Sequence, residues 1–116
     1  MSGTLSRNKG RRAETEAAHL LSERGFTIIE LGPGRKSEDI LAEDERGRWS
    51  CEVKNCRIWK LTDWRRQAKA QSRARNARWI LLCRVPGYPS TFYAEGTDLG
   101  PTVWRGNGAR EETVAG

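Results

Sequence analysis

Two short segments of this 116-residue chain carry residues that could do chemistry together. Glu52 and Lys54 flank Val53, and Asp39 lies upstream of them. Side chains two residues apart on a strand point to the same face, so Glu52 and Lys54 share one face. Clustered carboxylates repel each other, and a bound Mg²⁺ or Mn²⁺ relieves that repulsion. A lysine beside the cation can orient a water molecule or neutralise charge on a phosphate under attack.

The glutamate and the lysine also have an ordinary interpretation, because acidic and basic side chains alternate on the solvated face of many antiparallel strands. The elements around them favour convergence instead. We expect a short strand over residues 39–43, a hairpin turn over residues 44–47 and a third strand over residues 49–55. Asp39 then starts the strand next to the one that carries Glu52, so the two carboxylates can meet.

Hydrophobic periodicity predicts the other elements. The first helix has Ala13, Ala17, Leu20 and Leu21 on one face and stops at Gly25. This first helix is expected over residues 9–24. The other expected elements are a strand over 26–31, a helix from Thr62 or Asp63 to about residue 76, and strands over 79–85 and 91–95. This order predicts an α/β domain with a mixed five-stranded β-sheet flanked by helices.

We expect this domain to span residues 1–96, with residues 1–8 flexible. Residues 97–116 are predicted as a polar tail because glycine and proline interrupt any periodic pattern there, and both order and disorder stay open for it. One small, partly polar stripe on the second helix is expected to pack on the sheet. Its members are Gln67, Ala70, Gln71, Ala74 and Ala77.

The chain is basic, with 21 Lys and Arg against 15 Asp and Glu and a formal net charge of +6. The positive charge is concentrated before the first helix and along the second. These residues are candidates for contacts to phosphates, with a merely solvated surface as the alternative for any one of them. The candidates are Arg7, Lys9, Arg11, Arg12, Arg57, Lys60, Arg65, Arg66, Lys69 and Arg73.

Four further residues lie where they could touch DNA. Arg35 and Lys36 precede Asp39, lie closest in sequence to the candidate metal site and are expected to contact phosphates there. Trp59 and Trp64 lie among positive charges and could stack on exposed bases or wedge a junction. An anchoring role in the core or in a dimer interface is the favoured interpretation of both tryptophans.

Composition excludes several classes of protein. No apolar run is long enough to span a membrane, and the N-terminus lacks the apolar segment of a secretory signal. Three cysteines without a CxxC pair and a single histidine support neither a disulfide framework nor a zinc site. We therefore expect a cytoplasmic protein without a membrane partner. His19 is interpreted as a solvated surface residue.

The ordered set of segments KGRRAE, SEDILA, CEVKN and QAKAQ resembles the PD-(D/E)xK nuclease superfamily, and within it the small archaeal-type Holliday junction resolvases. The resemblance implies a restriction-endonuclease-like fold. It makes Asp39 and Glu52 metal-binding acids and Lys54 the catalytic lysine. Glu38 stands where the family usually has proline.

The resemblance assigns roles to further residues. Glu14 becomes the acid of the first helix, although Glu16, at the opposite edge of the apolar stripe, is a competing candidate. The main-chain carbonyl of Val53 becomes a metal ligand. Gln67 or Gln71 matches the glutamine that many members place behind the metal site.

The function that these observations predict is Mg²⁺-dependent hydrolysis of phosphodiester bonds in branched DNA, with Mn²⁺ able to substitute. The resemblance implies a homodimer, and paired symmetric cuts need two sites. Two alternatives stay open. One is a nicking or restriction-like endonuclease that acts on duplex DNA, and the other is a basic DNA-binding module without catalysis.

Overall fold

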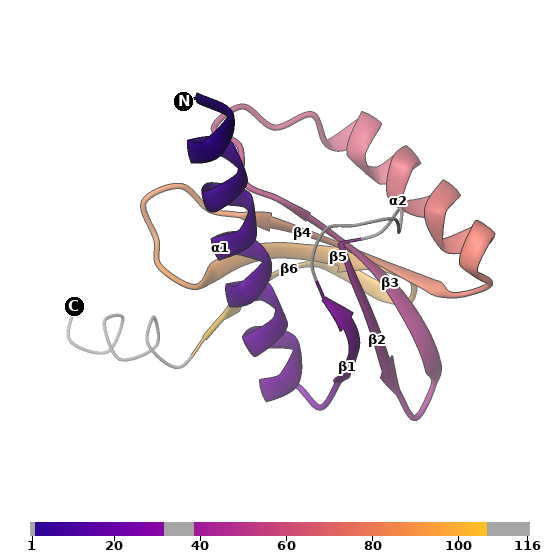
Figure 1. Ribbon diagram of the computed structural model, residues 1–116. Coiled ribbons are helices and arrows are strands. Elements are labelled where there is room, and N and C mark those ends of the chain that lie inside the picture. Colours follow the sequence, from indigo (N-terminus) through magenta and orange to yellow (C-terminus); the bar gives the residue numbers. More distant parts are fainter. Residues whose placement is uncertain (1, 32–38, 107–116) are drawn as a thin grey trace.

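The computed structural model describes residues 2–31 and 39–106, with side chains from residue 12 onward. These ranges form two helices, each followed by three strands (Figure 1). In chain order the elements are α1 (Ser2–Glu23), β1 (Thr27–Leu31), β2 (Ile40–Asp44), β3 (Gly47–Lys54), α2 (Leu61–Arg75), β4 (Arg78–Arg84), β5 (Thr91–Gly96) and β6 (Leu99–Arg105).

The six strands form one mixed sheet whose spatial order follows the chain, from β1 to β6. Neighbouring strands are antiparallel except β3 and β4, which run parallel. Parallel strands need a long crossover connection, and α2 provides it. The fold is therefore the predicted α/β arrangement of a mixed sheet flanked by helices.

The two helices cover opposite faces of the sheet, because alternate residues of the strands pack on different helices. Cys51, Ile80 and Leu82 join the larger core with the apolar side of α1. Leu81 and Cys83 instead pack with Trp64 of α2. The predicted helical stripe of α1 is confirmed, since its four residues are buried; they are Ala13, Ala17, Leu20 and Leu21.

The buried stripe of α2 differs from the prediction. Trp64, Ala68 and Ser72 face the sheet, whereas Ala70 and Ala74 are exposed. The aromatic ring of Trp64 provides far more apolar area than an alanine, and it fixes the rotation of the helix. This rotation leaves Gln67 and Gln71 at the edge of the interface that faces β3.

The expected count of five strands is wrong by one. Residues 99–105, predicted as part of a polar tail, form β6 and pair with β5. Most of β6 is exposed, and Pro101 lies in it, as is usual only for a strand at a sheet edge. Trp104 is its buried anchor, with the guanidinium of Arg24 lying 4.7 Å from the ring centroid.

The first helix begins earlier than the expected residue 9, because residues 2–8 also belong to α1. That residues 1–8 are flexible stays a prediction. The tail beyond residue 106 lies outside the described residues. No helix within the described ranges is long and apolar enough to cross a membrane.

Gly96 offers a test of the packing between β4 and β5. A Cβ atom at this position would overlap the main-chain oxygen of Trp79 and lie 3.1 Å from the Cα of Ile80. Gly96→Ala is therefore expected to lower the free energy of unfolding by about 1–3 kcal/mol, as overpacked cores do. Urea unfolding measures the change.

Gly100→Ala is the matched control, because a Cβ there meets nothing within 4 Å. We expect it to change the free energy of unfolding by less than about 0.5 kcal/mol. Equal effects of the two substitutions would contradict the described pairing.

Candidate functional site

The polar face of β3 lies beneath α2. Trp49 and Cys51 are buried in the core on the α1 side, so Glu52 and Lys54 point toward α2, as the alternation predicted. Glu52 is only 4% exposed. A carboxyl group buried this deeply is costly unless neighbouring groups or a cation compensate for the lost water.

Asp39 is fixed against β3 by two hydrogen bonds. Its backbone N–H donates to the carbonyl of Cys51 at 3.1 Å, and its carboxylate Oδ2 accepts from the N–H of Val53 at 2.8 Å. The predicted hairpin register is thereby confirmed, with Ile40 opposite Cys51. Asp39 and Glu52 are brought together as the sequence predicted.

The contact between these two acids changes the chemistry of Glu52. Burial, together with a hydrogen bond and charge repulsion from Asp39, raises the pKa of Glu52 to about 9. The positive charge of Lys54 and a hydrogen bond from Gln71 act in the opposite direction. The pair therefore resists carrying two negative charges without a positive partner.

The helix α2 supplies two glutamines to this cluster. Lys54 Nζ donates to Gln67 Oε1 at 3.3 Å and lies 5.7 Å from the centroid of the Trp64 ring. Gln71 hydrogen-bonds Glu52. Both glutamines that the sequence left as alternatives therefore contact the cluster, each through a different partner.

The donor set fits a divalent cation. Glu52 Oε2 is buried and accepts no hydrogen bond from the described residues, and the same holds for Gln71 Oε1. Carboxylate and amide oxygens are the ligands that hard cations such as Mg²⁺ prefer. Within the described ranges, no three His, Cys, Asp or Glu side chains form a ready metal-binding group.

The third predicted acid, Glu14, lies on α1 and not on the hairpin that carries Asp39 and Glu52. Glu14 is half-buried on α1, the helix that packs against β1 and β3. Its competitor Glu16 accepts a hydrogen bond from Arg84 Nε of β4 at 2.8 Å. Glu16 is therefore engaged elsewhere, which favours Glu14 as the acid of the first helix.

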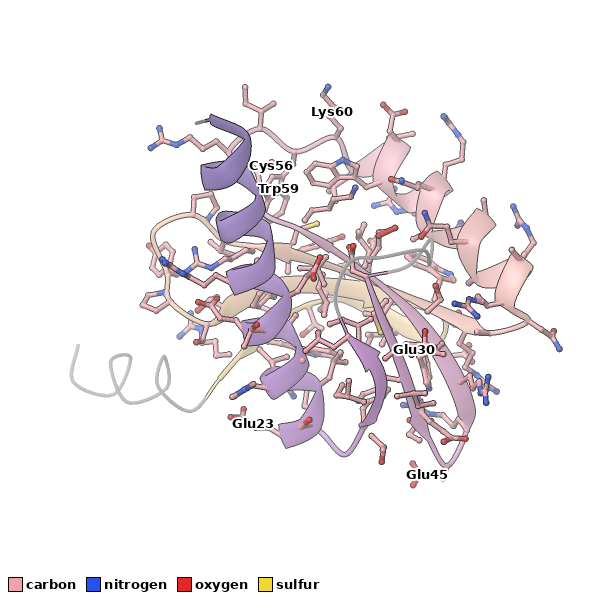
Figure 2. All side chains as sticks on the ribbon, in the orientation of Figure 1. Glu23, Glu30, Glu45, Cys56, Trp59 and Lys60 are labelled. Atoms are coloured by element: carbon pink, nitrogen blue, oxygen red, sulfur yellow. The ribbon has the colours of Figure 1, made fainter. Side chains whose placement is uncertain are left out.

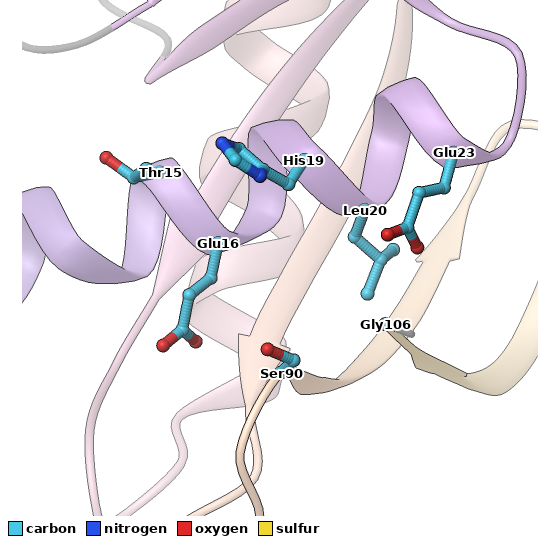
Figure 3. Close-up of a pocket in the computed structure, with 7 residues that line it drawn as sticks. All are labelled: Thr15, Glu16, His19, Leu20, Glu23, Ser90 and Gly106. Atoms are coloured by element: carbon cyan, nitrogen blue, oxygen red, sulfur yellow. The ribbon is translucent and has the colours of Figure 1, made fainter. Parts of the chain in front are cut away.

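Glu16 also lines an open pocket of about 270 Å³ on the side of α1, and it is the one candidate site residue in the lining of that pocket. Figure 3 shows Glu16, His19 and Glu23 along the helix with Ser90 across from them. The other lining residues are Thr15, Leu20 and Gly106. His19 is exposed, as predicted.

The sequence analysis did not predict a partly buried ion pair between Arg65 and Glu95. Arg65, predicted to contact DNA, donates from Nε and Nη2 to the carboxylate of Glu95 at 2.5 and 3.1 Å. Tyr93 donates its hydroxyl to the same carboxylate at 2.5 Å. This network fastens α2 to β5, so Arg65 serves the fold. The only sequence signal was the polar alternation of Tyr93 and Glu95 in a strand.

The other predicted DNA contacts divide into two groups. Arg12, Arg57, Lys60, Arg66, Lys69 and Arg73 are exposed in the structure. Arg66 lies 3.4 Å from Asp63. The side chains of Arg7, Lys9 and Arg11 and all of Arg35 and Lys36 lie outside the described part of the chain. Figure 2 shows the many basic side chains that project from α2 and the loop before it.

The fold has a counterpart among solved structures. It is similar to that of Hjc, a Holliday junction resolvase of the archaeal hyperthermophile Archaeoglobus fulgidus, with a TM-score of 0.59 and 24% sequence identity. The similarity covers 76% of this chain and 72% of Hjc. No protein-family model and no curated protein matches the chain.

The Arg65–Glu95 pair predicts a pH-dependent stability. Burial raises the pKa of Glu95, but the hydrogen bonds from Arg65 and Tyr93 outweigh it, so the net pKa lies below the ordinary value of 4.5. The stabilisation is present above pH 4.5 and is lost as the pH falls through the lowered pKa. Glu95→Gln should cost about 1–2 kcal/mol at pH 7 and less at pH 3.5.

Urea unfolding at both pH values measures this difference. Glu43→Gln, at an exposed position of β2, is the control and should leave the stability unchanged. If the difference in the free energy of unfolding between the wild type and Glu95→Gln increased toward low pH, the described network would be contradicted.

Proposed function

We propose that this protein is a Mg²⁺-dependent endodeoxyribonuclease that cuts branched DNA. The observation that carries the proposal is the Asp39 carboxylate, held by the N–H of Val53 against the buried Glu52, with Lys54 one position beyond Val53. The fold shared with Hjc, a Holliday junction resolvase, supports the choice of substrate.

Each residue of the cluster has a proposed role. Asp39, Glu52, Glu14 and the carbonyl of Val53 hold the cation, for which Mn²⁺ can substitute. When bound, a divalent cation polarises a phosphate and lowers the pKa of a coordinated water molecule.

Lys54 is proposed to orient the attacking water or to stabilise the charge that develops on the phosphate. Gln67 holds the ammonium group of Lys54 in place through the hydrogen bond between Nζ and Oε1. Gln71 is proposed to orient the Glu52 carboxylate, since it donates to one side of that group and leaves Oε2 available.

The exposed basic side chains of α2 and its preceding loop are proposed to bind the DNA backbone. Each contact neutralises a phosphate and releases counterions, so binding should weaken as salt rises. A homodimer is part of the proposal, because resolution of a four-way junction requires two symmetric cuts and one chain carries one site.

Cleavage of a mobile four-way junction in the presence of Mg²⁺ tests this function. Asp39→Asn, Glu52→Gln and Lys54→Ala should each lower the cleavage rate at least about a hundredfold, because each removes a charge from the reacting centre. Asn retains an oxygen that can accept the Val53 N–H, so the first variant keeps the backbone contact. Glu43→Gln is the matched control and should cleave at the wild-type rate.

A second readout separates metal binding from catalysis. Mg²⁺ should raise the melting temperature of the wild type and of Lys54→Ala but not that of Glu52→Gln, because only a ligand bound to the folded state stabilises it. Equal cleavage by all variants would leave a basic DNA-binding module as the better description. Equal rates on the junction and on the matching linear duplex would favour a nicking or restriction-like endonuclease.

A pair of substitutions on α1 identifies its acid. Glu14→Gln should reduce junction cleavage by about tenfold or more, whereas Glu16→Gln should reduce only stability, because Glu16 pairs with Arg84. Cleavage rates at saturating Mg²⁺ and thermal melting give the two readouts. The reverse pattern would assign the role to Glu16.

A further inference from the structure

The loop between β3 and α2, residues 55–60, presents a large apolar side chain to solvent. Ile58 is 79% exposed, the largest exposed fraction among the large hydrophobic residues of the described chain. A single exposed apolar residue needs no explanation by itself. Ile58 differs from the other exposed apolar residues because its loop is held by packing contacts, carries positive charge and lies beside the candidate site.

The loop is held by the residues on either side of its tip. Trp59 Nε1 donates to the carbonyl of Cys56 at 3.0 Å, which closes a tight turn around Ile58. The Trp59 ring packs on Tyr93, with 5.6 Å between the ring centroids. Tyr93 is in turn hydrogen-bonded to Glu95. The apolar tip therefore stands on a supported base, and little conformational entropy is lost when it binds.

Both tryptophans that could have stacked on bases are used for packing within the protein. Trp64 is buried against Leu81 and Cys83, and Trp59 is half-buried beside Tyr93. Figure 2 shows Trp59 and Cys56 at the base of the loop, with Lys60 projecting outward. Ile58 is the apolar side chain of this region that remains available for a partner.

The loop lies beside the candidate site and carries positive charge. It begins directly after Lys54 and ends where α2 starts, and Lys60, the N-cap residue of that helix, makes no side-chain cap hydrogen bond. Arg57 and Lys60 are exposed on either side of Ile58. Cations that flank an apolar tip suit a polyanion with stacked apolar groups inside, which describes a nucleic acid and not the apolar core of a protein interface.

We propose that Ile58 is a wedge that enters between bases at the branch point of DNA bound to the site, with Arg57 and Lys60 on the flanking phosphates. The inference rests on the proposed function and specifies its substrate. Insertion of an apolar side chain into an intact duplex must break the stacking of a base step. Stacking is already interrupted at a branch point, so the wedge favours branched over linear DNA.

The experiment measures unstacking without cleavage. A four-way junction carries 2-aminopurine at the branch point, and the protein is added in EDTA, where the fluorescence of the base increases when its stacking is lost. The wild type should produce this increase. Ile58→Ala should remove most of it and should lower the cleavage rate on the junction about tenfold, with less than about a twofold change on a linear duplex.

Matched variants control for other effects. Val103→Ala alters another exposed apolar residue, 53% exposed on β6, where it pairs with Tyr93 at the support of the loop and not at its tip, and it should behave as the wild type. Ile58→Leu should retain the fluorescence increase, because it keeps the apolar volume. Because Ile58 is exposed, its replacement should leave the melting temperature unchanged, and thermal melting measures this.

Three outcomes would overturn the wedge. The first is an equal fluorescence increase with wild type and Ile58→Ala, and the second is no increase with the wild type. The third is a change of oligomeric state in Ile58→Ala by light scattering without a change in fluorescence, which would place Ile58 against a second copy of the chain. The proposed function fails separately, through unchanged cleavage by Asp39→Asn, and an Ile58-dependent signal could persist in that case.

Discussion

The hydrogen bond from the N–H of Val53 to the Asp39 carboxylate is the contact on which the candidate site depends. It exists only because β2 and β3 pair in one register, which places Asp39 at the mouth of the hairpin. A slip by one residue would turn Glu52 into the α1 core and Cys51 toward α2. The burial of the apolar side chains of β3, above all Trp49, therefore fixes the register and keeps Asp39 next to Glu52.

Much of this arrangement is readable from the sequence, because the relevant signals are local. The alternation of Cys51, Glu52, Val53 and Lys54 assigns one face to the core and the other to chemistry, and the turn at residues 44–47 fixes the partner strand. The structure agrees on both points. The role of Glu14 as a metal ligand stays a prediction.

The features that sequence reasoning missed depend on distant partners. β6 has little apolar periodicity, and it exists because β5 offers it an unpaired edge and Trp104 reaches the core. Arg65 looks like any other cation of a basic helix until Glu95, thirty residues later, is found beneath it. The rotation of α2 was mispredicted because the burial of Trp64 outweighs a stripe of alanines.

The order of the strands in the sheet has a consequence for how the site forms. Every strand lies beside its neighbour in the chain, and only the joint between β3 and β4 needs a crossover. Asp39, Glu52, Lys54, Gln67 and Gln71 all belong to one hairpin and the helix that follows it. The contacts among these five residues therefore span no more than 19 positions, so the chain entropy lost in closing them is moderate. A single uninterrupted stretch, residues 39–71, encodes nearly the whole proposed reaction centre, and the rest of the chain supplies the scaffold that buries it.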